Sequence, residues 1–243
     1  MQLLSATWQN LHNVGTLSTT CEGGVSEGPF KSLNLGLHVG DNPQNVLKNR
    51  SLLNTFIPKQ AVWIDQVHSA DVLIVDESFD YTATHTGDAL YTKLSNQPLA
   101  IMTADCLPIL LASNDGKEVA AIHGGWRGLE RGIIENTFNC FSAKCEHINA
   151  WLGPAIGPSQ FEVGADVFEL FKAKSPLFEV AFKPQANQKF LADIYAIARI
   201  LLNQLGIKNI TGGEYCTVSQ HQLFFSYRRD GQTGRMGTLI WRK

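Results

Sequence analysis

The chain has 243 residues, of which 44% are hydrophobic and 17% are charged, and its 20 Lys and Arg against 22 Asp and Glu give a formal net charge of −2. This composition supports a large buried core and excludes a largely disordered chain. The balanced charge argues against a nucleic-acid binder that relies on a strongly basic surface.

Helices and strands are interspersed without a regular order. Helical spacing of apolar residues predicts helices over 43–56, 129–141, 165–174 and 194–205, the first with Pro43 at a favoured first position and the last capped by Asp193. Short apolar runs predict strands at 61–64, 72–75, 99–103, 119–122, 148–152 and 178–182, and a terminal hairpin of 223–228 with 235–241. Because the elements do not alternate strictly and no linker divides the chain, we expect one α+β domain over 1–243, with mixed β-sheets layered against helices.

Three features bear on the cell compartment. The most apolar stretch, 99–112, is interrupted by Asp105 and is shorter than the roughly 20 residues that a bilayer requires. Residues 1–10 have no basic start followed by an apolar run, so we expect no signal peptide. The five cysteines are dispersed and form no CxxC pair. We therefore expect a cytoplasmic protein that does not associate with membranes.

Arg50 has an unusual position for a charged residue. At about 100° per residue it falls about 40° from Val46, within the same apolar arc as Leu53. An unpaired guanidinium in a core is very costly, so this side chain needs anionic or carbonyl partners. Two interpretations are open: a structural pair, and a clamp for a phosphate or carboxylate ligand.

Cys106 and His123 each follow a predicted strand in the sequence by a few residues at most. Cys106 follows the strand 99–103, and His123 opens the loop His123-Gly124-Gly125-Trp126-Arg127-Gly128 ahead of a helix. Ligand and catalytic groups often lie where a rigid strand gives way to a loop. The glycines allow close approach of a ligand to the backbone, and a helix N-terminus favours anions. These two positions are therefore candidates for a functional site.

His68, between two predicted strands, adds a third candidate. One Cys and two His form a plausible zinc set that leaves one coordination position open. Alternatively, Cys106 is a thiolate nucleophile and His123 its base. The spacing of these residues does not separate the two arrangements, and an isolated Cys or His is most often structural.

The segment 224–230, with Arg235 beyond it, combines aromatic and cationic side chains. It is too short, in a chain that is not basic, to indicate a nucleic-acid patch. We expect a solvated hairpin with Asp–Arg pairs, and a ligand-facing role is the alternative.

A series of motifs in order along the chain identifies a family. The motifs are Ser32-Leu33-Asn34-Leu35-Gly36, Val39-Gly40-Asp41, Asn49-Arg50, Gln66-x-His68, Gly87-Asp88-Ala89, Thr103-Ala104-Asp105-Cys106-x-Pro108, His123-x-Gly125-Trp126-Arg127-Gly128, Gly153-Pro154-Ala155-Ile156, Phe161-Glu162-Val163, Cys216-Thr217 and Phe225-Ser226-Tyr227-Arg228. Together they closely resemble the bacterial YfiH-type family, also called the laccase-domain or polyphenol-oxidase-like family. The resemblance runs from about residue 14 to the C-terminus.

The resemblance implies a mixed α/β fold with layered sheets and a metal held by His68, Cys106 and His123. It also favours the phosphate-clamp interpretation of Arg50, and we expect Asn34 and Arg127 to bind phosphate or substrate with it. A set with one thiolate suits zinc, although copper can occupy it on affinity grounds. Seven dispersed histidines with no H-x-H pair do not readily build a multicopper array.

The activities described for the family are those of purine nucleoside enzymes. We therefore expect phosphorolysis of adenosine, inosine, guanosine and S-methyl-5′-thioadenosine, and hydrolytic deamination of adenosine, with Asp88 or Asp105 as proton carriers. The expected partners are purine nucleosides and phosphate, with no nucleic acid, and the expected assembly is a monomer or weak homo-oligomer. Two alternatives remain: an amidase with a Cys106 nucleophile that edits cell-wall precursors, and a copper-dependent polyphenol oxidase.

Overall fold

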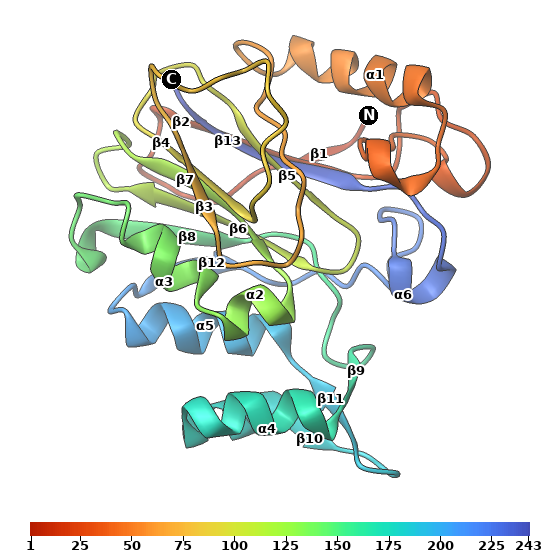
Figure 1. Ribbon diagram of the computed structural model, residues 1–243, viewed down its shortest axis with the longest axis vertical. Helices are drawn as coiled ribbons and strands as arrows, with labels where there is room; N and C mark the ends of the chain where they lie inside the picture. Colours follow the sequence, from red (N-terminus) through yellow and green to blue (C-terminus); the bar gives the residue numbers. More distant parts are fainter.

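The computed structural model describes residues 1–243 and arranges them around three β-sheets (Figure 1). The strands are β1 (Leu3–Leu4), β2 (Val14–Thr19), β3 (Val72–Val75), β4 (Ala89–Thr92), β5 (Leu99–Thr103), β6 (Leu107–Ser113), β7 (Val119–Gly124), β8 (Ile148–Leu152), β9 (Glu162–Gly164), β10 (Phe182–Pro184), β11 (Lys189–Ala192), β12 (Asn209–Gly212) and β13 (Met236–Arg242). The α-helices are α1 (Pro43–Leu52), α2 (Trp126–Glu130), α3 (Ile133–Phe138), α4 (Ala165–Lys174), α5 (Ile194–Gln204) and α6 (Tyr227–Asp230). None of these helices combines the length and the apolar character needed to cross a bilayer.

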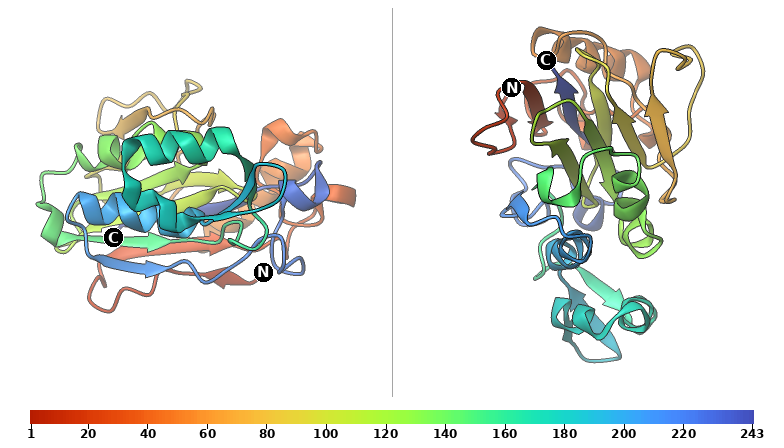
Figure 2. Two further views of the ribbon diagram at one scale, coloured as in Figure 1. Left: turned by 90° about the horizontal axis from the view of Figure 1, so that it is seen from below. Right: turned by 90° about the vertical axis from the view of Figure 1, so that its left-hand side faces the viewer.

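The largest sheet has six strands in the order β12-β8-β6-β7-β4-β3, with parallel pairs at its two edges and antiparallel pairs between them. A second sheet has the order β1-β2-β13-β5, and a third has the order β10-β11-β9. In Figure 1, α1 lies above the four-stranded sheet, and α2, α3 and α5 lie below the six-stranded sheet. The right-hand view of Figure 2 shows that α4 and the three-stranded sheet project from the main body.

The alternation of side chains along β6 explains the layers. Ile109 and Leu111 belong to the core on the helical side, while Leu110 and Ala112 belong to the core that faces the four-stranded sheet. Successive residues of a strand point to opposite faces, so a strand buried on both faces is apolar throughout. The apolar run of β6 therefore resembles those of β5 and β8, although only the latter two are predicted from the sequence.

The sequence predicts several elements correctly. The predicted strands 72–75, 99–103 and 148–152 and the predicted helix 165–174 coincide with β3, β5, β8 and α4. The predicted caps also form: Asn42 accepts a hydrogen bond from the N–H of Gln44, and Asp193 accepts one from the N–H of Ala196. The expected fold class, mixed sheets layered against helices, is confirmed.

Three predicted elements are wrong in part. The predicted strand 61–64 contributes only a single bridge, between Val62 and Leu99. The predicted strand 178–182 is mostly the 3₁₀ helix Pro176–Ala181, because Pro176 starts it and the Ser175 hydroxyl accepts a hydrogen bond from the backbone N–H of Leu177. The predicted helix 129–141 begins earlier, at α2, and is interrupted before α3.

The interruption between α2 and α3 lies at Gly132, whose φ of +89° is in the left-handed region that glycine adopts readily. The terminal hairpin is also wrong. β13 pairs with β2 and β5, and Ser226 caps the short helix α6 by accepting a hydrogen bond from the N–H of Arg229.

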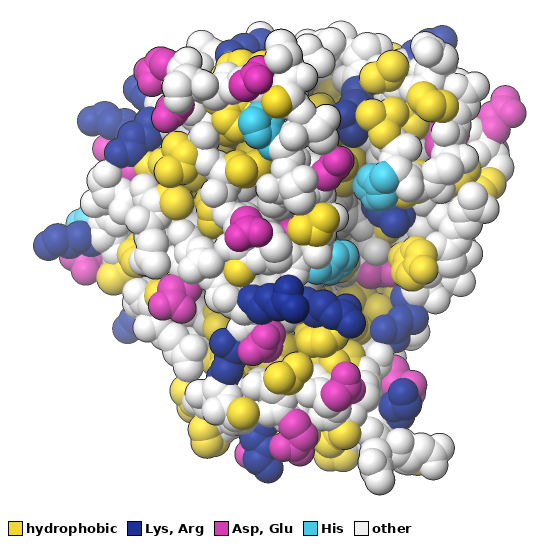
Figure 3. Space-filling view, viewed as in Figure 1, with side chains coloured by type: hydrophobic (Ala, Val, Ile, Leu, Met, Phe, Trp, Pro, Cys, Tyr) yellow, Lys and Arg dark blue, Asp and Glu magenta, His cyan; other side chains and the backbone are white.

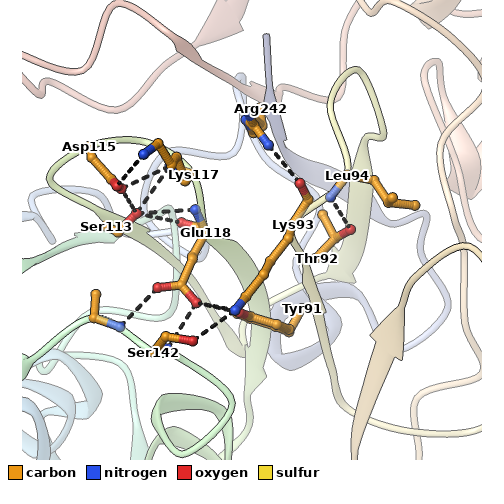
Figure 4. A network of polar contacts seen from close by, with 11 residues as sticks. Tyr91, Thr92, Lys93, Leu94, Ser113, Asp115, Lys117, Glu118, Ser142 and Arg242 are labelled. Atoms are coloured by element: carbon orange, nitrogen blue, oxygen red, sulfur yellow. Dashed lines mark hydrogen bonds and ion pairs between the residues drawn. The ribbon is translucent and has the colours of Figure 1, made fainter.

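A buried carboxylate fastens the end of the six-stranded sheet opposite the functional residues described below (Figure 4). Glu118, just before β7, accepts hydrogen bonds from the Tyr91 hydroxyl at 2.5 Å and from the backbone N–H groups of Ser142 and Ala143 at 2.9 Å. The Lys93 ammonium lies 3.3 Å from the same carboxylate. This network joins β4 and β7 to the loop that follows α3.

Candidate metal centre

The pairing of β6 with β7 brings Cys106 and His123 together. Leu107 is opposite Gly124 and Pro108 is opposite His123, so Cys106, one residue before β6, lies beside the C-terminal end of β7. The backbone N–H of His123 donates to the carbonyl of Asp88 at 2.7 Å, because β4 runs antiparallel to β7 on its other side. Asp88, Cys106 and His123, which are far apart in sequence, therefore meet at one end of these neighbouring strands.

His68 reaches the same point from the segment before β3. Its φ of +60° places it in the left-handed region, where residues other than glycine are uncommon. The segment is held by the Asp88 carboxylate, which accepts the backbone N–H groups of Val67 at 3.2 Å, His68 at 3.0 Å and Ser69 at 2.6 Å. A single buried carboxylate thus fixes the backbone that carries His68.

Asp88 also orients the second histidine. Its Oδ1 lies 2.7 Å from Nδ1 of His123, so Nε2 of His123 is the nitrogen left to bind a ligand. Asp88 is fully buried. Burial alone would raise its pKa, but the hydrogen bond and charge of His123 and the backbone donors lower the pKa to about 2.

The three side chains fit a metal ion. Their ligand atoms all lie within 4.8 Å of one another, and Sγ of Cys106 is 3.6 Å from Nε2 of His68. Tetrahedral zinc, with bonds of about 2.3 Å to sulfur and about 2.1 Å to nitrogen, would separate such a pair by about 3.6 Å. The donor set of one thiolate and two imidazoles also suits zinc. The chain can therefore hold a single metal ion here through three protein ligands.

The electrostatics of the cluster favour the deprotonated thiol that a metal requires. Burial would raise the pKa of Cys106, but the charge of His123 and the hydrogen bonds from both histidines lower it. Burial would lower the pKa of His123, whereas Cys106 and Asp88 raise it. The thiolate needs no further deprotonation to bind a cation, whereas His123 must release the proton on Nε2 before that nitrogen can bind a metal.

Two pockets open on the cluster and share His68, Ala104, Cys106 and Tyr227. We call the first the apolar pocket; it has a volume of about 290 Å³ and is lined in addition by Asp105, Trp126, Arg127, Ile156, Phe161, Ile194 and Arg228. We call the second the polar pocket; it has a volume of about 380 Å³ and is lined in addition by His38, Gln66, Met102, Thr103, His123 and Arg235. In Figure 3, a histidine and several Lys and Arg side chains surround a hollow between the positions that α2 and α6 have in Figure 1.

The structure places Arg50 behind the polar pocket. Its Nε donates to the carbonyl of Leu35 at 3.0 Å, Nη2 contacts Sδ of Met102 at 3.6 Å, and the guanidinium lies 4.1 Å from the ring centre of Trp63. Burial lowers the pKa of Arg50 to about 10, which leaves the side chain charged at neutral pH. These partners include no carboxylate, so the structural ion pair is not formed, and Met102 lies between the guanidinium and the pocket.

Asn34 and Arg127 lie in different surroundings. Asn34 is fully buried, donates to the carbonyl of Gly36 and to Asp41, and accepts the N–H of Arg235 at 2.9 Å. Arg127 is exposed in the apolar pocket, with its guanidinium 4.3 Å from the ring centre of Trp126. Of these two, only Arg127 faces a pocket.

Asp105 lines the apolar pocket and connects it to the C-terminal segment. Its φ is +100°, its Oδ1 accepts the Thr217 hydroxyl at 2.6 Å, and its Oδ2 accepts the backbone N–H of Arg228 at 2.7 Å. The carboxylate therefore fixes the strained turn that precedes Cys106. Asp88, the other carboxylate expected to carry protons, lines neither pocket.

Reasoning from sequence did not place His38, Tyr227 or Arg235 at the site. Tyr227 is 61% exposed and borders both pockets, and the Arg235 guanidinium lies 5.9 Å from its ring centre. The mixture of aromatic and cationic residues in 224–235 was the available signal, and the ligand-facing alternative for that segment fits the structure. His38 carries no comparable local signal.

The chain matches, over residues 15–243, the protein family described as multi-copper polyphenol oxidoreductase laccase. It is 47% identical over 243 residues to a Shigella flexneri protein named purine nucleoside phosphorylase YfiH, covering 99% of this chain and 98% of that one. It is 46% identical over 246 residues to a Haemophilus influenzae protein named purine nucleoside phosphorylase, covering 99% of both chains.

Solved structures show the same similarity over the whole chain. Neisseria meningitidis protein NMB0706 superposes with a TM-score of 0.93 at 42% identity and full coverage of both chains. YlmD from Geobacillus stearothermophilus superposes with a TM-score of 0.89 at 33% identity, covering 100% of this chain and 97% of that one. The single three-ligand cluster of this chain lies within a fold shared along its whole length with these proteins. The chain therefore belongs to the laccase-like YfiH family.

Proposed function

We propose that the chain is a zinc-dependent purine nucleoside enzyme of the cytoplasm. It phosphorolyses adenosine, inosine, guanosine and S-methyl-5′-thioadenosine, and it deaminates adenosine by hydrolysis. Relatives that bear the name purine nucleoside phosphorylase support the reaction class. The observation that carries the proposal is the His68–Cys106–His123 cluster, whose open side faces two pockets large enough for a small organic ligand.

When bound, zinc supplies a Lewis acid that binds an oxyanion or lowers the pKa of water. The chain's own residues do the rest. Asp88 positions His123 and the backbone of His68, so that the ligand set is preorganised. Arg50 favours an anion near Met102. Asp105 is the carboxylate that lines the apolar pocket, and we assign proton transfer to it. In phosphorolysis, a phosphate oxygen attacks the anomeric carbon of the nucleoside as the purine leaves.

Chromatography of adenosine incubated with the purified chain tests the proposal. Adenine and ribose 1-phosphate should form only with phosphate present, and inosine should form with or without it. The Cys106→Ala variant should lose bound zinc and both reactions. Intact adenosine in every sample, from protein that carries one zinc per chain, would contradict the proposal and direct the search to cell-wall precursors and phenols.

A second candidate uses the same residues without a metal. The Asp88 carboxylate orients the His123 imidazole by a hydrogen bond, and a ring nitrogen of His123 lies within 4.8 Å of the Cys106 thiol, as in Cys–His nucleophiles. This arrangement would suit an amidase acting on a cell-wall precursor. Metal analysis separates the two, because only the nucleoside enzyme needs stoichiometric zinc.

A further inference from the structure

The polar pocket has two cations close to it, Arg235 and Arg50, and neither forms a direct ion pair with a carboxylate, although Asp105 and Asp65 act on them from a greater distance. The Arg235 guanidinium lines this pocket and donates through Nη1 to the carbonyls of Thr233 and Gly234 at 3.0 Å. The Arg50 guanidinium, behind Met102, donates to a carbonyl and contacts the methionine sulfur. Carbonyl groups satisfy hydrogen bonds but do not neutralise charge, so an anion that entered this pocket would be attracted by both cations.

The remaining polar groups of this pocket leave room for an anion. His38 lines it, and the charges of Arg235, Asp65 and Arg50 all act on His38. Burial, followed by the charge of Arg235, lowers the pKa of His38, so its ring is neutral at pH 7 and can donate one hydrogen bond. Gln66 is occupied by the backbone of Met102, to which it is bonded at 2.8 Å through both its amide nitrogen and its amide oxygen. The pocket thus offers donors and positive charge.

The apolar pocket differs in chemistry. Trp126, Ile156, Phe161 and Ile194 give it aromatic and aliphatic walls. The Arg228 guanidinium is already engaged by the carbonyls of Gln160 at 3.2 Å and Glu162 at 3.0 Å. Walls of this kind suit a flat, weakly polar ring system.

We propose that the metal cluster divides the substrates between the two pockets: the purine base enters the apolar pocket, and phosphate enters the polar pocket, where Arg235 and His38 hold it. This inference rests on the proposed function. It assigns phosphate binding to Arg235, the residue directly before β13. This residue is remote in sequence from Arg50 and from the loop that carries Arg127. The ribose then lies between the pockets, over the metal ligands that both pockets share.

Tyr227 forms the wall that the two pockets share. Its ring is 61% exposed and borders both, with Arg235 on one side. An aromatic face at this place contacts the nucleoside without a direct bond to phosphate. Removing the ring should therefore weaken nucleoside binding more than phosphate binding.

Two-substrate kinetics with a matched pair of arginine variants tests this division. We expect Arg235→Gln to raise the KM for phosphate by about 10- to 100-fold, with a change of less than about threefold in the KM for adenosine. Arg127→Gln, which removes one of the two cations that line the other pocket, should leave the KM for phosphate unchanged. Arg235→Lys should keep part of the affinity for phosphate, because lysine retains the positive charge. It should not keep all of it, because lysine lacks the planar guanidinium that can donate two parallel hydrogen bonds. Tyr227→Ala should raise the KM for adenosine and leave that for phosphate nearly unchanged, and Tyr227→Phe, which keeps the ring, should raise the KM for adenosine by less than Tyr227→Ala does.

A phosphate effect in Arg127→Gln but not in Arg235→Gln would overturn the assignment. Calorimetric titration of the metal-loaded wild type and both variants with inorganic phosphate gives a readout that does not depend on turnover. Binding lost only in Arg235→Gln would support the phosphate site even if adenosine stayed intact, in which case the proposed function alone would fail. Equal binding to wild type and Arg235→Gln would refute the site. Melting temperatures within a few degrees of the wild type, measured for each variant, exclude unfolding as the cause of any loss.

Discussion

The Asp88 carboxylate lies 2.7 Å from Nδ1 of His123 and, through its bond to the backbone N–H of His68 at 3.0 Å, holds a second metal ligand in place. One buried residue at the start of β4 therefore positions both histidines. Partners of this kind set the tautomer and the orientation of a metal-binding imidazole. The geometry of the centre depends on Asp88 as much as on the ligands.

Replacing Asp88 should weaken metal binding while leaving all three ligands in place. We expect Asp88→Asn to lower zinc affinity about 10- to 100-fold, because the amide cannot reproduce the charge or all the acceptor positions of the carboxylate. Competition with a chromophoric chelator measures this affinity. Asp71→Asn, an exposed aspartate nearby, is the control. Equal affinity in wild type and Asp88→Asn would show that the carboxylate has no part in the centre.

Gly125 controls the space beside His68. A Cβ at this position would lie 2.6 Å from Cδ2 of the His68 ring and 3.4 Å from Sγ of Cys106. The ring can move more easily than the backbone, so Gly125→Ala should displace His68 and reduce zinc content and turnover together. Metal analysis and the melting temperature of the metal-free protein check this, and we expect the second to change little. Full zinc binding by the variant would contradict this packing argument.

Arg50 should matter more for phosphorolysis than for deamination. The reason is that only phosphorolysis requires an anionic substrate near the buried charge. We expect Arg50→Ala to lower phosphate-dependent release of adenine at least about tenfold more than formation of inosine. Arg131→Ala, on the exposed surface after α2, serves as the control. An equal loss of both reactions would refute this division of roles.

Glu118 makes the stability of the sheet depend on pH. Burial alone would raise its pKa, but hydrogen bonds from Ser142, Tyr91 and Ala143 and the Lys93 ammonium lower it below the ordinary value. The unfolded chain therefore binds a proton more readily, and this contribution to stability is present above about pH 4.5 and is lost as the pH falls through the lower pKa of the folded state.

Glu118→Gln should accordingly reduce the free energy of unfolding by about 1–3 kcal/mol at pH 7 and by much less near pH 3. Urea unfolding of both metal-free proteins at several pH values gives the comparison. A difference that stays constant from pH 7 to pH 3 would mean that the Glu118 charge contributes nothing.

The sequence predicts local elements well where the signal is local. The caps Asn42 and Asp193 and the apolar face of α5 define helices without tertiary information. The incorrect terminal hairpin shows the limit, because β13 pairs with β2, more than 200 residues earlier in the chain. Nothing near 223–241 specifies that partner.

The site residues also differ in whether a local sequence pattern predicts them. The residue types and their loops single out Cys106 and His123, but the residues alone do not place them together, since their proximity depends on the register of β6 against β7. The residue types also offer His68 and a zinc set, and the family resemblance favours the metal over the thiolate nucleophile. Arg235 faces the polar pocket because β13 lies beside β5, a contact between segments more than 130 residues apart that no local pattern specifies.

Returning zinc to metal-free protein shows directly whether phosphorolysis depends on a metal at the cluster of His68, Cys106 and His123. The chain is freed of metal with a chelator, zinc is added back in measured steps, and phosphate-dependent release of adenine from adenosine is followed at each step. We expect no activity in the stripped protein and a linear return of activity that ends at one zinc per chain, with no return in Cys106→Ala. Full activity in metal-free protein would contradict this expectation.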